Sequence, residues 1–368
     1  MKVRAWTYEE FLASKDLWED ALNRSLDNNI FLTWEWLSTW WKHYGKGKKF
    51  LLVALLRNDR IVAAAPLMCS EYRVFGFRLS RIEFVASPTS DYHTFLLTEK
   101  NDDHVRLIVE YAKQRVTGWD SIELRDIPED SETARSLIAL RETLGVNQRA
   151  NEQTARVYLP NRFEDYFGRL GLNLRKNLTR YERKLKRDFN VSFEVFTDPI
   201  IINDVMKTFF DLHQKRWQTK KEPGVFRDRI ARDFHSEIAV CFNKRGWLTL
   251  SAISLNDEVR AANYTFTYAN KTYYYLSGFD PELSKYCMGN LLHMYTIRYC
   301  IAAGTKEYDM MRGNHPYKFG WKARSMINLE FWVSKRRIVP ILYDAFTKNE
   351  RLLGMSRELG KHISFKSY

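Results

Sequence analysis

Four side chains that can transfer protons or hold anions follow a short apolar run near the end of the chain. They are Asp309, Arg312, Tyr317 and Lys318, within YDMMRGNHPYKFGWKARS at residues 308–325. A carboxylate or a phenol can exchange a proton, whereas a guanidinium or an ammonium can hold an oxyanion or a phosphate. This stretch predicts a site of chemistry at the end of a buried strand. The structural alternative is an Asp309–Arg312 ion pair that braces the loop.

His213 is a second candidate for proton transfer. It lies in DVMKTFFDLHQKRWQTK, residues 204–220, where Met206, Phe210 and Trp217 share one helical face with it. An imidazole titrates near neutral pH and therefore suits a general base. A lone histidine on an apolar face is more often a core residue, so both interpretations stay open here.

A strongly basic segment, residues 173–187, predicts a helix with two different faces. Four residues form an apolar stripe that can dock onto a domain: Leu174, Leu178, Tyr181 and Leu185. Arg175, Arg180 and five further Lys or Arg residues fall on the other sides. Because guanidinium forks suit phosphate, Arg175 and Arg180 are candidate contacts for an anionic substrate. The alternative is a solvated helix face.

The positive charge of the chain is concentrated in its second half. The formal net charge is +13, from 58 Lys and Arg against 45 Asp and Glu. Residues 1–160 contain 22 basic and 23 acidic side chains, which leaves 36 and 22 in residues 161–368. The second half therefore carries +14, which favours an anionic ligand such as a phosphate-bearing cofactor, a nucleic acid or an anionic lipid.

Length and composition favour two globular domains. The chain has 368 residues, of which 45% are hydrophobic and 15% aromatic. The apolar runs are too short to span a bilayer, and acidic residues interrupt the N-terminal stretch where a signal peptide needs an apolar core. We therefore expect a cytoplasmic protein. The four cysteines are widely spaced without a CxxC pair, so neither a disulfide framework nor a metal site is expected.

Two matching hairpin signals suggest that the fold is duplicated. NDRIVAA at residues 58–64 and NDEVRAA at 256–262 each lie between two apolar runs. Asn and Asp tolerate the positive φ of tight turns, so both pairs predict hairpins. We expect domains at residues 1–160 and 161–368.

The second half shows a mixed α/β pattern. Helices are expected at residues 204–220, 228–243 and 288–303. Strands are expected at residues 247–255, 259–268, 272–279, 306–311 and near 328–334. Helices that alternate with an antiparallel meander and a later strand predict an α/β fold with a mixed sheet.

This order of elements resembles the GNAT acyltransferase fold. The motifs that carry the resemblance are FLTWEWLSTWWKHYG (31–45), APLM (65–68), SDYHTFLL (90–97), LRKNLTRYERKL (174–185), LHQKRW (212–217), YYYLSGFDPE (273–282) and YDMMRGNHPYKFGW (308–321). They are similar to the duplicated branch that includes acetyltransferase-like proteins associated with cellulose and exopolysaccharide biosynthesis. More distantly they resemble the Fem-type peptidyltransferases, which use aminoacyl-tRNA.

The resemblance implies two tandem GNAT-like domains, the first of them degenerate. In such a sheet the fourth and fifth strands splay apart to admit an acyl-CoA donor such as acetyl-CoA. The N-terminus of the following helix binds the pyrophosphate. Here that loop is LSKYCMGN, residues 283–290, with Lys285, Gly289 and Asn290 as candidate donor-binding residues. It has one glycine where the fold usually has two, which leaves acetyl-CoA as donor in question.

The resemblance also suggests roles for the opening residues. Tyr317 would donate a proton to a departing thiolate, and Lys318 and Arg312 would hold an oxyanion or a substrate phosphate. Asp309 would orient one of them or act as a base if burial raises its pKa. His213 and Arg216 match a His-x-x-Arg-Trp run of the family, which favours His213 as a base and Arg216 as a substrate contact.

The predicted function is therefore acyl transfer from an acyl-CoA to an amine or hydroxyl. The acceptor would be a small molecule, or a lipid-linked or nucleotide-linked sugar, in cell-envelope or exopolysaccharide metabolism. One alternative is a Fem-like transferase with an aminoacyl-tRNA donor. The other is a non-catalytic binding module with a decayed site.

Overall fold

The structure is a computed structural model that describes residues 1–74 and 77–335. The chain folds as two compact units, each described here by itself. Unit 1 contains residues 1–152 and returns at residue 327, and unit 2 contains residues 153–326. The expected division was 1–160 and 161–368. The second unit ends at residue 326 because the last described strand, β13 (Arg324–Ser334), pairs with a strand of unit 1.

Unit 1 is an α/β unit built on a mixed sheet. Its strands are β1 (Lys2–Trp6), β2 (Lys49–Arg57), β3 (Arg60–Val74), β4 (Phe77–Phe84), β5 (Leu96–Leu97), β6 (Ser121–Pro128) and β13. Its helices are α1 (Tyr8–Ala13), α2 (Lys15–Asn23), η1 (Ile30–Leu32), α3 (Trp34–Tyr44), α4 (Asp102–Arg115), α5 (Glu132–Ala139) and α6 (Arg141–Leu144). The sheet order is β1-β2-β3-β4-β6-β13. Among the described strands of this unit, β4 and β6 pair in parallel and the other neighbours pair antiparallel.

The tryptophan-rich helix α3 is part of the core of unit 1. Trp36 and Trp40 are buried, and their indole N–H groups donate to the hydroxyls of Ser90 and Thr89. Indole groups that are buried and hydrogen-bonded in this way stabilise packing.

Unit 2 begins in strand β7 (Asn147–Tyr158), which carries the chain out of unit 1. Its other strands are β8 (Val191–Phe196), β9 (Leu248–Leu255), β10 (Glu258–Tyr268), β11 (Lys271–Phe279) and β12 (Glu307–Arg312). Its helices are α7 (Phe163–Arg169), α8 (Leu172–Asp188), α9 (Pro199–Thr219), η2 (Val225–Arg227), α10 (Arg229–Lys244), η3 (Pro281–Tyr286), α11 (Met288–Ala302) and α12 (Pro316–Gly320). The sheet order is β7-β12-β11-β10-β9-β8.

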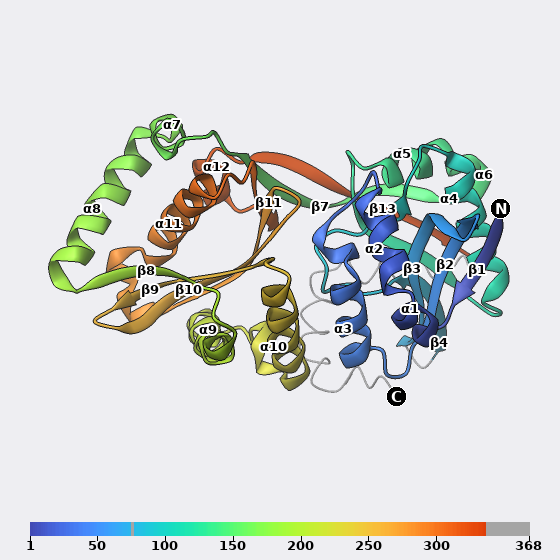
Figure 1. The fold of residues 1–368 in the computed structure, drawn as a ribbon, viewed down its shortest axis with the longest axis horizontal. Helices are drawn as coiled ribbons and strands as arrows, with labels where there is room; N and C mark the ends of the chain where they lie inside the picture. The colour runs from blue at the N-terminus through green and yellow to red at the C-terminus, as the bar shows by residue number, and fades with distance from the viewer. Residues whose placement is uncertain (75–76, 336–368) are drawn as a thin grey trace. The chain divides into compact units, whose positions relative to one another are not determined.

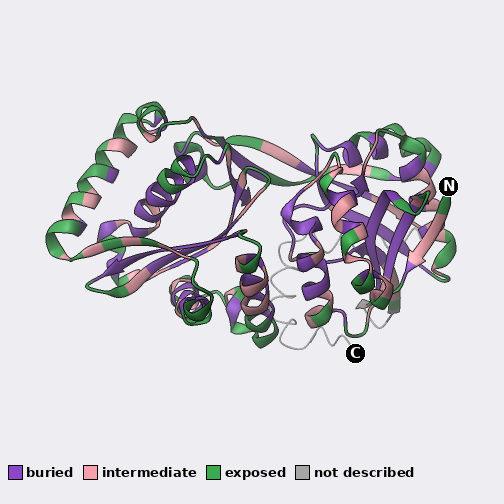
Figure 2. Ribbon diagram, in the orientation of Figure 1, coloured by how far each residue is buried: buried purple, intermediate pink, exposed green. Residues whose placement is uncertain are grey.

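Helices cover both faces of this second sheet. In Figure 1, α9 and α10 lie on one face, and α8, α11 and α12 lie on the other. Figure 2 shows α11 largely buried and much of α8 exposed. The predicted apolar stripe of α8 is confirmed, because Leu178 and Leu185 are buried and Leu174 and Tyr181 pack against the same cluster.

Both predicted hairpins are confirmed. Asn58 and Asp59 join β2 to β3, and Asn256 and Asp257 join β9 to β10, all four with φ between 50° and 68°. Positive φ at both central residues is the turn geometry that matches the twist of paired strands. The helices and strands predicted in the second half also form, with bounds that shift by a few residues.

Candidate active site

The parallel strands of unit 2 part after three paired positions. Residues 271–273 of β11 pair with residues 307–309 of β12. The pairing ends there, although β11 continues to Phe279 and β12 to Arg312. A bulge in β11 opposite Tyr264 and Thr265 also shifts its register with β10. The side chains of residues 274–279 therefore lie beside a place where the sheet opens.

Helix α11 begins next to the opened strands. Its N-cap residue, Cys287, has φ 51° and provides no side-chain hydrogen bond to the helix. A Cβ at Gly289 would lie 3.1 Å from the ring of Phe279, so glycine allows the helix to approach β11 closely. N–H groups at a helix start that lack a side-chain cap are donors for an anion.

Three polar side chains converge on the α11 side of β11. The hydroxyl of Tyr274 donates to Ser277 Oγ at 2.6 Å, and Arg216 Nη1 donates to the same oxygen at 3.1 Å. Arg216 belongs to α9, and its guanidinium also lies 4.6 Å from the ring centre of Phe279. Because Ser277 Oγ accepts twice, its own proton can be donated to a further oxygen.

Two aromatic hydroxyls and an imidazole complete this cluster. The ring of His293 lies 4.4 Å from that of Tyr274 and 6.0 Å from that of Tyr317, and its Nδ1 is 3.2 Å from the Tyr308 hydroxyl. Burial, with the charges of Lys318 and Arg216, lowers the pKa of His293 to about 3, so the ring is neutral at pH 7. Burial raises the pKa of Tyr317 well above its usual range.

Tyr317 combines this raised pKa with access to solvent. It lies on α12, where 43% of its surface is exposed, and its ring stacks on His315. A phenol that stays protonated but can be reached from solvent is suited to donate a proton. Burial and the nearby Tyr274 raise the pKa of Tyr317, and the charge of Arg216 opposes the rise.

Lys318 has a structural role that corrects its predicted one. It is 2% exposed, and its Nζ donates to the carbonyls of Met310, Met311 and Arg312 at 2.7, 3.0 and 2.6 Å. An ammonium has three N–H donors, so none is left for an oxyanion. Lys318 instead holds the end of β12, where Met311 has φ 61°.

Asp309 faces away from the Tyr317 cluster. Side chains alternate along a strand, and its neighbour Tyr308 contacts His293, so Asp309 points to the opposite face. Its carboxylate accepts from the Met311 N–H and lies 3.7 Å from Arg156 Nε. Burial raises the pKa of Asp309, and the charges of Lys271 and Arg156 oppose the rise. The structure does not bring Asp309 together with Tyr317.

Arg312 is partly exposed at the end of β12. Its backbone pairs with Thr154 of β7. Its role as a substrate contact stays a prediction, and so does its pairing with Asp309.

His213 lies in an aromatic core on the other face of the sheet. It is 1% exposed, its Nε2 accepts from Trp217 Nε1–H at 2.8 Å, and Phe226 packs on it at 4.8 Å. Burial lowers the pKa of His213 to about 4. These surroundings match the core interpretation, because α9 packs against β11 here so closely that a Cβ at Gly278 would lie 2.5 Å from the His213 backbone N.

The remaining candidates lie at the start of α11 and on α8. Lys285 is exposed, with Nζ 5.1 Å from the ring centre of Tyr286, and the Asn290 N–H donates to the Cys287 carbonyl. Arg175 and Arg180 line a groove on α8.

The sequence-based prediction missed Tyr274, Ser277 and His293. A histidine inside the apolar helix 288–303 and a serine in YYYLSGF were the signals present.

Comparison with known proteins decides the fold. Residues 173–319 match the family model described as an acetyltransferase (GNAT) domain. No curated protein matches the sequence significantly. Among solved structures, "Crystal structure of FemX" aligns at TM-score 0.64 and 12% identity, covering 90% of this chain and 97% of that one. A tandem GNAT protein from the clavulanic acid biosynthesis pathway aligns at TM-score 0.50 and 9% identity, covering 90% and 97%.

The chain has a tandem GNAT fold. The C-terminal domain of a putative lysylphosphatidylglycerol synthetase from Agrobacterium fabrum is also similar, at TM-score 0.57 and 13% identity over 91% of this chain and 96% of that one. In GNAT terms, β11 and β12 are the fourth and fifth strands of unit 2 counted from β8, and they part as expected. The narrower relation to the cellulose-associated branch stays a prediction.

The described part of the chain contains neither a cluster of metal ligands nor a membrane-spanning helix. Among residues 1–74 and 77–335 no group of three or more His, Cys, Asp or Glu is arranged to hold a metal ion. In the same part of the chain no helix is long and apolar enough to cross a membrane.

Proposed function

We propose that this protein is an acyl-CoA-dependent acyltransferase whose reaction takes place beside β11 and β12 of unit 2. The observation that carries the proposal is the cluster of Tyr274, Ser277, Arg216, His293 and Tyr317 beside strands that part after three paired positions. A GNAT fold alone does not establish catalysis, so the proposal of an enzyme depends on this cluster of side chains.

The start of α11 fits the phosphates of an acyl-CoA. Its N-terminal N–H groups have no side-chain cap, and Lys285 adds positive charge in the preceding loop. When bound, the donor would supply the activated thioester. Gly289 contributes indirectly to donor binding, because it allows the start of α11 to lie close to the ring of Phe279.

The residues of the cluster divide the work of acyl transfer. The Ser277 hydroxyl, which accepts from Tyr274 and Arg216, is oriented to donate to a developing oxyanion. Tyr317 stays protonated because burial raises its pKa, and it would protonate the leaving thiolate. His293 is neutral and lies between Tyr274 and Tyr317, where it orders both rings.

Cell-envelope or exopolysaccharide metabolism is the proposed setting. The support is the resemblance of the motifs to acetyltransferase-like proteins associated with cellulose and exopolysaccharide biosynthesis. We propose an amine or a hydroxyl of a sugar-containing molecule as the acceptor.

A Fem-like transferase with an aminoacyl-tRNA donor is the second candidate. The FemX structure shares this fold over 90% of the chain, and α8 presents a row of basic side chains. The row is compatible with a nucleic-acid backbone, whose binding weakens steeply as salt increases.

A thermal-shift experiment tests the two donors against each other. Purified protein is heated with CoA, acetyl-CoA, longer acyl-CoAs or bulk tRNA. A ligand at about a hundred times its Kd stabilises the folded state by about 2.7 kcal/mol. We expect a clear shift with an acyl-CoA and a smaller one in Gly289→Val. A shift with tRNA alone, at low salt, would favour the second candidate. No shift with either would mean that the site has decayed.

A further inference from the structure

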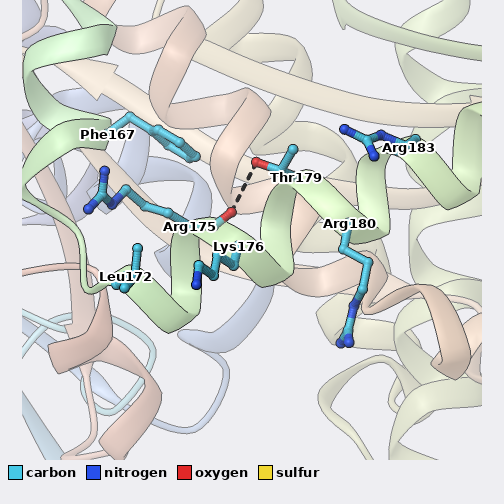
Figure 3. A pocket seen from close by; sticks show the side chains of 7 residues that line it. All are labelled: Phe167, Leu172, Arg175, Lys176, Thr179, Arg180 and Arg183. Atoms are coloured by element: carbon cyan, nitrogen blue, oxygen red, sulfur yellow. Dashed lines mark hydrogen bonds between the residues drawn. The ribbon is translucent and has the colours of Figure 1, made fainter.

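Four cationic side chains line a groove on the exposed side of α8. They are Arg175, Lys176, Arg180 and Arg183, and Phe167, Leu172 and Thr179 complete the lining (Figure 3). The groove has a volume of about 430 Å³. None of the lining residues is acidic, and within the described chain none of the four cations forms an ion pair.

The fold keeps the acidic residues of α8 away from this groove. Glu182 accepts from Tyr295 of α11 and from Lys186, both at 2.8 Å. Asp188 accepts from Arg187 and from Tyr286. Both carboxylates therefore have partners elsewhere, and they do not balance the positive charge that lines the groove.

The groove lies beside elements of the candidate active site. A Cβ at Gly320 of α12 would lie 3.8 Å from Leu174, so the N-terminal part of α8 packs next to the helix that carries Tyr317. At the other end of α8, Lys184 and Lys285 both lie 5.1 Å from the ring centre of Tyr286. The row of positive charge thus runs toward the loop that precedes α11.

We propose that this groove binds a diphosphate ester. Arg175 and Arg183 are eight residues apart on α8, about 12 Å along the helix axis, and guanidinium forks bind phosphate oxygens in pairs. Four cations suit the two or three negative charges of a diphosphate better than the single charge of a phosphate diester. The volume lies in the range of small-molecule sites.

The apolar part of the lining indicates that the ligand is organic. Leu172 is 56% exposed, and the ring of Phe167 forms a wall beside Arg175 (Figure 3). These two side chains can make apolar contacts with the organic group that is joined to the diphosphate, either a nucleoside or a lipid. The shared chemistry of a nucleotide-linked and a lipid-linked sugar is the diphosphate itself.

The groove then identifies the class of acceptor. This assignment rests on the proposed acyltransferase function, whereas binding of the diphosphate does not. The sugar of the bound molecule would be presented to the side of unit 2 that carries Tyr317.

Binding measurements with charge-matched variants test the proposal. The soluble probe is UDP-N-acetylglucosamine, titrated calorimetrically at fixed ionic strength. The lipid probe is undecaprenyl diphosphate in phosphatidylcholine vesicles, with plain vesicles and vesicles containing phosphatidylglycerol as references. The test variant is Arg180→Gln/Arg183→Gln. The control is Lys215→Gln/Lys244→Gln, which removes two exposed charges from α9 and α10.

We expect at least one diphosphate probe to bind, at least tenfold more weakly to the groove variant and unchanged to the control. Groove-dependent binding of the nucleotide sugar assigns a soluble source, and groove-dependent binding of the loaded vesicles assigns a lipid. Equal loss in both variants, or no loss in either, would overturn the proposal. So would groove-dependent binding to phosphatidylglycerol vesicles or to tRNA without binding to either diphosphate.

Binding of acetyl-CoA to the groove variant distinguishes a failure of this proposal from a failure of the proposed acyltransferase function. The groove variant should keep the acetyl-CoA thermal shift of the wild type. If no acyl-CoA binds but the diphosphate still depends on Arg180 and Arg183, the acyltransferase proposal fails and the groove remains.

Discussion

Units 1 and 2 share an arrangement of strands but differ in the polar groups that accompany it. In unit 1, residues 81–83 of β4 pair in parallel with residues 121–123 of β6. In unit 2, residues 271–273 of β11 pair in the same way with residues 307–309 of β12. A helix connects the strands in each case, α4 in unit 1 and α11 in unit 2.

The charged groups on the unit 1 sheet are held by one another. The ion pairs join Arg81 to Glu123, Arg125 to Glu123 and Glu330, and Arg149 to Glu330, at 2.6 to 3.0 Å. The Tyr72 hydroxyl donates to Glu83 at 2.6 Å. The N-terminus of α4 is also satisfied, because the Asn101 side chain accepts from the Asp103 N–H. These groups stabilise a sheet and leave little for a ligand.

Unit 2 has hydroxyls and a neutral imidazole in the corresponding place. Ser277 accepts two hydrogen bonds and keeps a proton to donate, and α11 starts without a side-chain cap. One topology therefore carries two different sets of polar groups, and the proposed function assigns the chemistry to the set in unit 2. The difference lies in side chains at the end of the parallel pair, and variants of matched residues in the two units can test it.

Loss of the Lys318 ammonium should produce the largest effect. In Lys318→Met, three buried carbonyls lose their donor, so we expect the free energy of unfolding to fall by at least about 3 kcal/mol. Lys113 in unit 1 donates to one carbonyl, that of Leu144, and Lys113→Met should cost about 1 kcal/mol. Urea denaturation of both variants measures the difference. Equal losses would show that Lys318 does not organise the end of β12.

Acid should destabilise unit 2 before unit 1. Burial lowers the folded-state pKa of His213 to about 4 and of His293 to about 3, below the usual value near 6.5. As pH falls from 6.5 to 4, the unfolded chain binds protons that the folded chain does not, so stability decreases. Each histidine therefore lowers the free energy of unfolding by about 3 kcal/mol at pH 4.

The opposite sign applies to one buried carboxyl in each unit, Asp27 in unit 1 and Asp309 in unit 2. Burial raises the pKa of Asp27, so its contribution to stability increases as pH falls through that pKa. The expected difference between the units therefore rests on His213 and His293.

Hydrogen exchange as a function of pH should show α9 and α11 losing protection before α5, whose first N–H groups donate to Asp27. Helix α4 is no reference, because burial also lowers the pKa of His104 within it. His213→Leu should reduce the acid sensitivity, whereas His315→Gln, at an exposed position, should leave it unchanged. Simultaneous loss of protection in both units would contradict the expected order.

Removal of the Tyr317 hydroxyl tests which unit does the chemistry. Tyr317→Phe should lower kcat about 100-fold, because the leaving thiolate loses its acid, while acetyl-CoA binds as before. The assay follows release of free CoA from acetyl-CoA with glucosamine as a probe acceptor. The matched control is Tyr299→Phe, another partly exposed tyrosine of unit 2. An unchanged kcat in Tyr317→Phe would remove Tyr317 from the proposed mechanism.

The elements of unit 2 could be predicted from sequence because their signals are local. The Asn-Asp turns, the helical spacing in α9 and the apolar stripe of α8 depend on neighbours within a few residues. Tyr317 was selected as a candidate in the same way, from a polar stretch after an apolar run, and its role stays a prediction. The two-unit fold followed from the repeated hairpin and the order of the motifs.

The rest of the site depends on contacts between distant segments. The rings of Tyr274 and His293 lie 4.4 Å apart because α11 packs on β11, which it approaches closely at Gly289. The bulge near Tyr264 and Thr265 sets the local register of β11 against β10. The role of Lys318 depends on a turn of the main chain at Met311, where φ is 61°. No periodicity in the sequence indicates such a turn at a methionine, which rarely adopts positive φ.

A smaller effect should come from Ser277, and here the two units offer matched serines. Ser277→Ala removes the proposed oxyanion donor, so kcat should fall about tenfold with little change in acetyl-CoA affinity. Tyr274→Phe removes one of the two bonds that orient Ser277 but keeps its hydroxyl, so its effect should be only a few-fold.

Ser121 in unit 1 is the first residue of β6 in the parallel pair with β4, and its hydroxyl donates to Glu123 at 3.4 Å. Ser121→Ala should leave kcat unchanged, because the carboxylates there are already held by arginines. If kcat falls as much in Ser121→Ala as in Ser277→Ala, both hydroxyls affect the rate by stabilising the structure of their units and not by contacting the substrate. A fall confined to Ser277→Ala would place the chemistry in unit 2.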